Sequence, residues 1–292
     1  AAALAFVDIE SETTINSAAS VEAAKGTYGL LAQQILNAEV ESKGLSVAFY
    51  GAIGAAVARM TVKPTVKAAI SGGTIVAKNL AVKALFNVNN NSTYTKTGKI
   101  TANALAGTGG GAVAASGAKA EITVDGSAAA AVENATVTLT GNADVISRAN
   151  GSITGKGEGL SVAGLVPVGG VEVTIQNTFD TTAQIIRTTI TGAKYVTVLA
   201  DYDGTVNGTA KGTAGGLLVA GTAQSLSMTE NITTKAEITT NSNITASETV
   251  SVLAQDEHQV GGKATGYSFS GVAAGGKTNI TTTITNNTTA KV

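Results

Sequence analysis

The sequence has no cysteine and no tryptophan, only two prolines and a single histidine among its 292 residues. The lack of cysteine excludes thiol catalysis, thiolate metal sites and disulfides. One histidine without cysteine partners cannot build a typical zinc site. Aromatic residues make up 4% of the chain, so alanine, valine, isoleucine and leucine must fill its core in place of rings.

Charge is also scarce. Charged residues account for 13% of the chain, and nineteen basic side chains balance twenty acidic ones. No basic stripe is present, so we expect no nucleic-acid partner. The uncharged runs Thr101–Ala118 and Gly212–Thr229 are interrupted by glycine pairs and polar residues, so we expect no transmembrane segment. Residues Ala1–Glu10 lack the basic and apolar regions of a signal peptide.

The chain contains an internal repeat of short strand-like runs. The runs begin about 23–35 residues apart, mostly close to 28, and every other unit carries a glycine-rich stretch of small residues. The openings are Leu45–Ala48, Thr74–Val76, Ile100–Ala102, Ala135–Leu139, Leu160–Ala163, Thr189–Thr191, Leu217–Ala220, Ile244–Ala246 and Tyr267–Phe269. The glycine-rich stretches include Gly51–Val57, Gly107–Val113, Gly164–Gly170 and Gly271–Gly276. A repeat of this length is typical of stacked solenoids.

A β unit of this length is too short to fold alone, but stacked units can bury a continuous aliphatic column. Six dipeptides are typical of turns, namely Asp125-Gly126, Gly141-Asn142, Asn150-Gly151, Asp203-Gly204, Asn207-Gly208 and Gly261-Gly262. The sequence therefore predicts an all-β protein, a right-handed parallel β-helix (solenoid) of about ten coils of roughly 28 residues. Such a stack would be a rod on the order of 50 Å long. A β-sandwich or barrel remains the alternative.

We expect one β-helix segment over residues 1–292, with 1–44 the least certain part. Within that part, Val21–Val40 has a local propensity for helix. However, residues 18–44 also span one repeat length before the opening at Leu45, so we interpret them as another coil. No capping segment is recognisable at either end, and solenoids need caps. We therefore expect the chain to be a segment of a longer repeat protein.

Two units resemble the repeats of large bacterial filamentous adhesins of the haemagglutinin and leukotoxin type. They are Leu45–Ile70 and the shorter unit Leu160–Gly170. The resemblance spans nearly the whole chain but is mainly compositional. It implies a secreted or cell-surface protein exported through an outer-membrane barrel, with structural repeats and no catalytic residue. The implied function is a structural or adhesive rod, and the implied partner is a protein or glycan receptor on a host or bacterial cell surface. A close variant is an extracellular fibre, in which uncapped ends or sheet edges of copies of the chain pair end to end. No cofactor or metal is expected.

The only histidine, His258, lies beside Asp256 and Glu257. An acid–base role is conceivable there, but we expect an exposed loop at a coil corner. A carbohydrate-active β-helix enzyme is the alternative function, because such enzymes need clustered carboxylates with a cation to hold the substrate. Asp201 and Asp203 are its best candidates, with Asp144, Arg148 or Arg187 a coil or two away. The same two aspartates could chelate calcium, but an ordinary turn is the better interpretation.

Three other patterns carry weaker signals. Gly109–Gly111 lacks the Lys-Ser/Thr of a phosphate loop, and its glycines more plausibly mark tight corners or close backbone approach. Asn-X-Ser/Thr triplets allow glycosylation, as a weak hypothesis; they begin at Asn91, Asn134, Asn150, Asn207, Asn231, Asn243, Asn279 and Asn287. The threonines of Ile280–Ile284 do not repeat in every coil, so they are interpreted as β-formers facing solvent.

Overall fold

The structure is a computed structural model that describes residues 2–15 and 20–292, and the elements of this part are all β-strands. The expected all-β class is confirmed. Among the described residues there is no helix long and apolar enough to cross a membrane. The strands are β1 (Ala2–Ile15), β2 (Ser20–Gln34), β3 (Asn37–Ala48), β4 (Gly51–Ser71), β5 (Thr74–Phe86), β6 (Lys99–Gly110), β7 (Val113–Glu133), β8 (Thr136–Leu139), β9 (Ala143–Ala163), β10 (Val166–Ile186), β11 (Thr189–Gly215), β12 (Val219–Ile238), β13 (Asn243–Phe269) and β14 (Ala273–Lys291).

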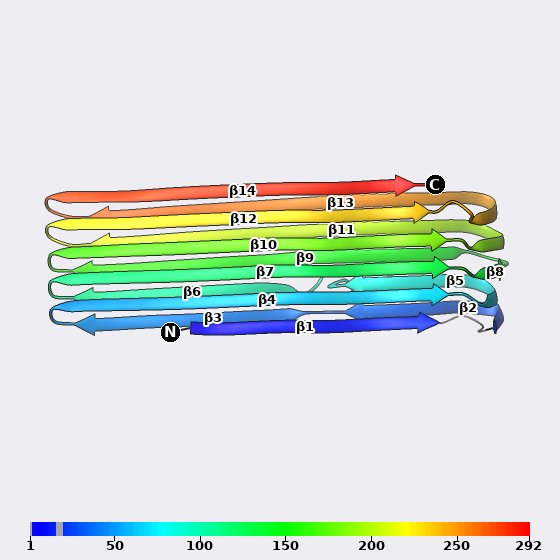
Figure 1. Ribbon diagram of the computed structural model, residues 1–292, viewed down its shortest axis with the longest axis horizontal. Coiled ribbons are helices and arrows are strands. Elements are labelled where there is room, and N and C mark those ends of the chain that lie inside the picture. Colours follow the sequence, from blue (N-terminus) through cyan, green and yellow to red (C-terminus); the bar gives the residue numbers. More distant parts are fainter. Residues whose placement is uncertain (1, 16–19) are drawn as a thin grey trace.

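The strands form two parallel sheets. Sheet A has the order β1-β4-β7-β10-β12-β14, and sheet B has the order β13-β11-β8-β5-β9-β6-β3 with β2 beside β5. The chain runs along sheet A, returns along sheet B and starts the next layer (Figure 1). Strands β8 and β9 are consecutive parts of one layer, which is why both pair with β5 and with β11. This arrangement is consistent with a β-helix.

The coil is about twice as long as expected. Val113 of β7 pairs with Val166 of β10, and Val168 of β10 pairs with Gly221 of β12, so the register advances by the same amount at both steps. The unit of the sequence repeat is therefore half a coil. Each coil contains sheet A and sheet B strands with the same two-residue alternation. The sequence pattern therefore repeats twice in each full coil.

The sequence openings mark the two ends of each coil. Thr74, Thr189 and Ile244 stand at the start of a sheet B strand, whereas Leu160 and Tyr267 stand near the end of one. The expected ten coils are thus wrong, since sheet A stacks six strands in the described part of the chain. Six layers spaced about 4.8 Å apart give a height of roughly 24 Å, about half the expected rod. The described segment is longest along its strands instead (Figure 1).

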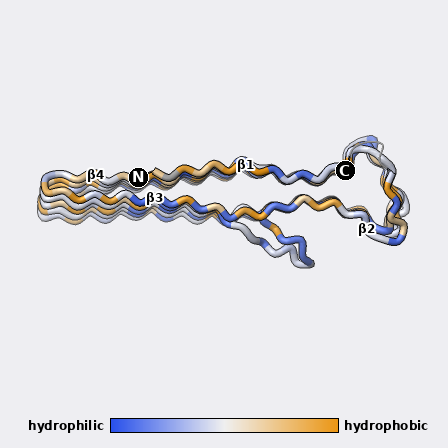
Figure 2. The backbone as a smooth tube through the Cα atoms, turned by 90° about the horizontal axis from the view of Figure 1, so that it is seen from below, coloured by the Kyte–Doolittle hydropathy of each residue, from blue (hydrophilic) through white to orange (hydrophobic). Residues whose placement is uncertain are grey.

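Inward-facing glycines and alanines let the two sheets approach each other closely. Figure 2 shows the sheets nearly in contact at one end, called the narrow end, and farther apart at the other, called the wide end. A Cβ atom on Gly208 of β11 would lie 2.4 Å from Leu226 of β12, and one on Gly155 of β9 would lie 3.0 Å from Val173 of β10. The close approach between coils expected at Gly109–Gly111 is also present, because a Cβ atom on Gly111 would clash with the carbonyl oxygen of Phe49 in the preceding coil.

Most of the dipeptides predicted as turns lie inside strands. Gly126, Gly151, Gly204 and Gly261 all fall within long strands, and only Gly141-Asn142 interrupts one, between β8 and β9. Gly126 makes room for Phe179 of the next layer, whose ring would be 2.5 Å from an added Cβ atom. These glycines therefore serve packing where the sequence suggested chain reversal.

One coil carries an insertion, residues 88–97, which we call the excursion. Phe86 pairs with Ala149 and Ile100 with Ile153, so Asn87 and Gly98 occupy the places of Asn150 and Gly151 in the next layer. The intervening residues leave the outline of sheet B as a separate loop (Figure 2). At its base, Asn87 Oδ1 accepts a hydrogen bond of 2.7 Å from the N–H of Leu36.

The N-terminal region also forms strands. Most of Val21–Val40, whose local propensity favours helix, lies in β2 and β3. Leu30, Ala32 and Val40 are buried in the core. Tertiary packing and the ladder to β5 and β6 therefore override the helical propensity.

Candidate functional site

The best sequence candidates for carboxylate chemistry lie on the outer face of sheet B, beside the excursion. Asp201 and Asp203 belong to β11, so the turn expected at these residues is wrong. Asp201 Oδ2 lies 2.9 Å from Arg148 Nη1 of β9, the neighbouring strand. Asp203 pairs with Lys96 of the excursion. Both carboxylates are therefore already partnered by a cation.

These charges anchor the excursion to the sheet. The guanidinium of Arg148 lies 4.3 Å from the centre of the Tyr94 ring, and Lys83 Nζ lies 5.1 Å from it. Asn150 Nδ2 donates a hydrogen bond of 3.0 Å to the carbonyl oxygen of Thr97. Cation–π contacts of this kind hold an aromatic loop in a fixed position.

The other two candidates, Asp144 and Arg187, are not part of the ion pairs that hold the excursion. Burial raises the pKa of Asp144, while a hydrogen bond with Thr197 and the charge of Lys83 oppose the rise. Burial also raises the pKa of Asp201, against Arg148 and Lys96. Arg187 lies at the wide end, where its Nε donates a hydrogen bond of 2.8 Å to Asn134 Oδ1.

A polar groove, here called the excursion groove, runs beside the excursion across the strands of sheet B. Its volume is about 530 Å³. The floor contains one outward side chain from each of five layers, and the wall is formed by residues 96–98 of the excursion and its base. The lining residues are Asn37, Lys96, Thr97, Gly98, Lys99, Asn150, Ser152, Asp203, Thr205, Glu257 and Gln259.

The exposed loop expected at His258 is wrong. His258 lies in β13, and its side chain is only 8% exposed. Its Nδ1 lies 3.1 Å from Glu230 Oε2 and its Nε2 lies 2.5 Å from Asp256 Oδ1. Glu257, the other neighbour in the sequence, faces outward into the excursion groove. Burial raises the pKa of Asp256, whereas the charge of His258 opposes that rise.

The histidine belongs to a buried polar cluster between the sheets, near the middle of their strands. Asn177 Nδ2 donates hydrogen bonds to Tyr202 Oη at 2.7 Å and to Glu230 Oε1 at 2.9 Å. Complete burial raises the pKa of Tyr202. The rings of Phe86, Phe179, Tyr202 and His258 follow one another with centroids 5.1, 5.7 and 5.5 Å apart.

The sequence alone does not reveal this cluster, because its members come from different layers. Only the parallel registry brings Asn177, Tyr202 and Glu230 together, and no local motif marks them. The pairing of Tyr202 with Asp256 is visible only once the coil length is known. No group of three or more histidine, aspartate or glutamate side chains within residues 2–15 and 20–292 is arranged to hold a metal ion.

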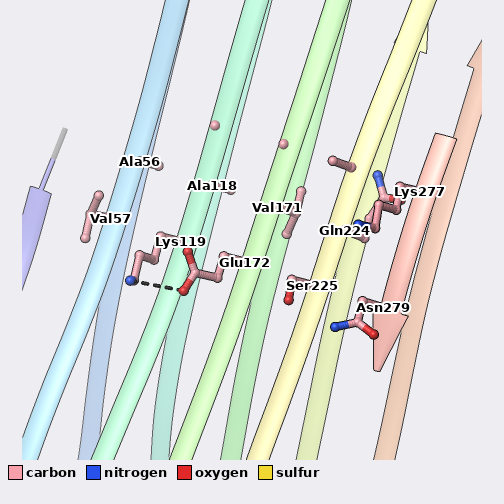
Figure 3. A pocket seen from close by; sticks show the side chains of 13 residues that line it. Ala56, Val57, Ala118, Lys119, Val171, Glu172, Gln224, Ser225, Lys277 and Asn279 are labelled. Carbon is pink, nitrogen blue, oxygen red and sulfur yellow. Dashed lines mark ion pairs between the residues drawn. The ribbon is translucent and has the colours of Figure 1, made fainter. Parts of the chain in front are cut away.

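A second depression, of about 510 Å³, crosses the outer face of sheet A. Its floor is a column of small residues, Gly117, Gly170 and Ala223, which lie side by side on three successive strands. Figure 3 shows the ion pair of Lys119 and Glu172 beside it, which spans 3.1 Å between β7 and β10. Seven of its thirteen lining residues are glycine, alanine or valine.

The narrow end exposes apolar side chains in successive layers. Leu45, Val47, Phe49, Tyr50 and Ile53 are each 77–86% exposed in the first of these layers. The later layers contribute Val113, Leu160, Val162, Leu165, Val168, Leu217, Leu218, Val219, Tyr267, Phe269 and Val272. A contiguous apolar surface of this kind is typical of a contact site.

Comparison with known proteins found no match for this chain among protein-family models, curated proteins or solved structures.

Proposed function

We propose that the chain is a segment of a right-handed parallel β-helix that serves as the structural and adhesive part of an exported bacterial surface protein. Right-handed crossovers are the near-universal choice for parallel strands, which supports the handedness. In this proposal the segment itself performs no catalysis and needs no cofactor. Its location is the cell surface or the extracellular medium.

The observation that carries the proposal is the constant register of the stacked coils. Three successive pairings in sheet A, from β7 to β14, run without a break and keep a nearly constant offset in sequence. Such regular stacking extends by repetition and presents the same surfaces in every layer. A scaffold that displays contacts along an axis is the function that this regularity suits best.

The charge arrangement argues for a non-catalytic role. The strongest carboxylate candidates, Asp201 and Asp203, are neutralised by Arg148 and Lys96. A glycosidase needs one carboxyl group free to donate a proton and another free to attack or to activate water. Here both carboxylates are committed to fixing the excursion.

The expected partners are a protein or glycan receptor on a host or bacterial cell, an outer-membrane export barrel during secretion, and further copies of the chain. The apolar narrow end supports the first of these.

Adhesion of the purified chain to cells tests the proposal. We expect immobilised protein to retain bacterial or host cells, and we expect substitution of Leu45, Val47 and Phe49 by serine to weaken retention. A matched control replaces three exposed residues of the sheet A outer face by serine. Equal retention by both variants would exclude the narrow end as the contact, and no retention of any cell type by the parent chain would contradict the adhesive role.

A carbohydrate-active enzyme remains the second candidate, because Asp203 and Glu257 both line the excursion groove. Incubation with polygalacturonate, alginate and neutral glucans, followed by measurement of new reducing ends, tests this candidate. We expect no cleavage. Cleavage that is lost in Asp203→Asn and Glu257→Gln would establish the enzyme and overturn the structural proposal.

A further inference from the structure

The floor of the excursion groove is a ladder of polar side chains with one member in each layer of sheet B. Register places Asn37 beside Lys99, Lys99 beside Ser152, Ser152 beside Thr205, and Thr205 beside Gln259. The link between Lys99 and Ser152 follows from the neighbouring pair Ile100 and Ile153. Five strands spaced about 4.8 Å apart give a floor roughly 19 Å long.

The side chains of this ladder have unused hydrogen-bonding capacity. In the described part of the chain, no hydrogen bond engages the side chains of Asn37, Ser152, Thr205 or Gln259. All four face outward on half-buried or exposed strand positions. Amide and hydroxyl groups both donate and accept, so the ladder suits a ligand that does the same.

The wall of the groove is held in place before any ligand binds. Lys96 is paired with Asp203, and the Thr97 carbonyl accepts a hydrogen bond from Asn150. Tyr94, on the same loop, is fixed by Arg148 of β9. A fixed wall lowers the cost of ordering a binding site.

The groove carries no excess of charge. Lys96 and Lys99 are matched by Asp203 and Glu257 among its lining residues. This balance disfavours an acidic or a basic polymer. A peptide strand would gain little, because sheet faces offer side chains while the backbone groups are already paired within the sheet. A linear, uncharged ligand that carries many hydroxyl groups matches the polar side chains of the floor, its length and its balanced charge.

We propose that the excursion groove binds a neutral linear oligosaccharide, laid along the stacking axis across β3, β6, β9, β11 and β13. This inference goes beyond the proposed adhesive function and rests on it, since it adds a glycan contact on sheet B to the apolar contact at the narrow end. Ser152, Thr205 and Gln259 contact the sugar hydroxyls, and the excursion closes one side of the site. Tyr94 and Arg148 are positioning residues that hold the excursion.

Binding of the full chain to a printed array of oligosaccharides tests the inference. The array contains neutral linear oligomers of glucose, galactose, mannose and N-acetylglucosamine, from disaccharides to hexasaccharides, with heparin and alginate fragments as acidic comparators. We expect binding to at least one neutral series, with affinity rising with length because the groove crosses five strands. Binding to acidic fragments alone, or to no sugar, would overturn the proposal.

Two matched variants locate the site. Thr205→Val removes a hydroxyl from the groove floor, and Thr209→Val makes the same change four residues along β11, outside the groove. We expect Thr205→Val to weaken binding roughly tenfold, which is the effect of about one lost hydrogen bond, and Thr209→Val to leave it unchanged. Equal effects of the two variants would show that the sugar binds elsewhere.

Removing the excursion gives an independent readout. A chain that lacks residues 88–97 should keep its strand content by circular dichroism and lose affinity for the sugar. Retained affinity in this folded variant would contradict the proposed wall. Loss of sugar binding with retained cell adhesion would contradict this inference alone. Cleavage of the bound sugar would contradict the proposal that the segment is not catalytic.

Discussion

Tyr202 illustrates how single residues stabilise the space between the two sheets. Its ring packs between Phe179 and His258, and its hydroxyl accepts a hydrogen bond from Asn177. Gly151 and Gly204 flank the ring on the same sheet, where an added Cβ atom would lie 2.3 Å and 2.9 Å from Tyr202 atoms. A large ring in one layer thus requires glycines in line with it.

The buried hydroxyl of Tyr202 provides the first prediction. Tyr202→Phe keeps the ring and removes the acceptor for Asn177, so we expect a loss of about 1 kcal/mol in the free energy of unfolding. Urea denaturation followed by circular dichroism measures the change. Tyr195→Phe is the control, because Tyr195 is 46% exposed. An equal effect of both substitutions would exclude a role for the buried hydrogen bond.

A second prediction concerns Asp144, whose pKa is raised by burial above its usual value of 3.8. A carboxyl group with a higher pKa in the folded chain binds protons more tightly there, so its ionisation reduces stability as pH rises through the window above 3.8. Asp144→Asn should therefore be more stable than the parent at pH 7. The difference should shrink as the pH falls through that window towards 3.8. Melting temperatures across this range test the sign, and a difference that grows on acidification would contradict it.

At the scale of elements, the close packing of the two sheets depends on which strands carry the small residues. In the narrow half, sheet B presents Gly155, Gly157 and Gly208 to bulky aliphatic residues of sheet A. Sheet A in turn has outward glycines, such as Gly117, with no atom within 4 Å of an added Cβ. The same residue type therefore has opposite roles on the two faces.

This contrast gives the third prediction. Gly208→Val places methyl groups against Leu226 and should cost about 2–3 kcal/mol through overpacking. Gly117→Ala should be neutral or slightly stabilising, because it reduces the freedom of the unfolded chain without a clash. Thermal and urea unfolding of the two variants measure the difference. Similar stability of both would contradict the close approach of the sheets.

The excursion gives the fourth prediction. Asn87 and Gly98 occupy the register positions of Asn150 and Gly151, so deleting residues 88–97 joins an Asn-Gly pair that the next layer already accommodates within a continuous strand. We expect this variant to fold with a change in melting temperature of only a few degrees, because long surface insertions contribute little to stability. Loss of cooperative unfolding would show that the excursion supports the coil.

At the scale of the molecule, the last strands leave core-facing residues partly uncovered. Ile280 and Ile284 of β14 are each 47% exposed, although they continue columns that are buried in the layer of β12. Open strand edges of this kind can pair with another chain.

The fifth prediction follows from this edge. The purified chain should associate as its concentration rises, and Ile280→Lys with Ile284→Lys should shift it towards monomer, because buried lysines are strongly disfavoured. Sedimentation velocity over a range of concentrations measures the shift. The control variant carries two lysines at Thr281 and Thr285, which face outward on the same strand. Equal association of both variants would place the contact elsewhere.

Amino-acid composition and alternation were sufficient to predict the all-β class, the repetition and the glycines that permit close approach. These features are local, because a strand's two-residue period and a missing side chain can be read wherever they occur. The strand status of Val21–Val40 was also predicted, from its length relative to the repeat and against its local propensity. The alternation of a glycine-rich and a polar unit, noticed in the sequence, corresponds to the two halves of one coil.

The coil length, the interior position of His258 and the groove beside the excursion depended on three-dimensional packing. Each rests on which residues become neighbours one full coil apart, and the sequence of one chain contains no direct record of such partners. The sheet A and sheet B strands of a coil have the same alternation, so only the hydrogen-bonded register distinguishes half a coil from a whole one. Burial of Glu230 and His258 likewise arises from stacking, because their charge alone would favour the surface.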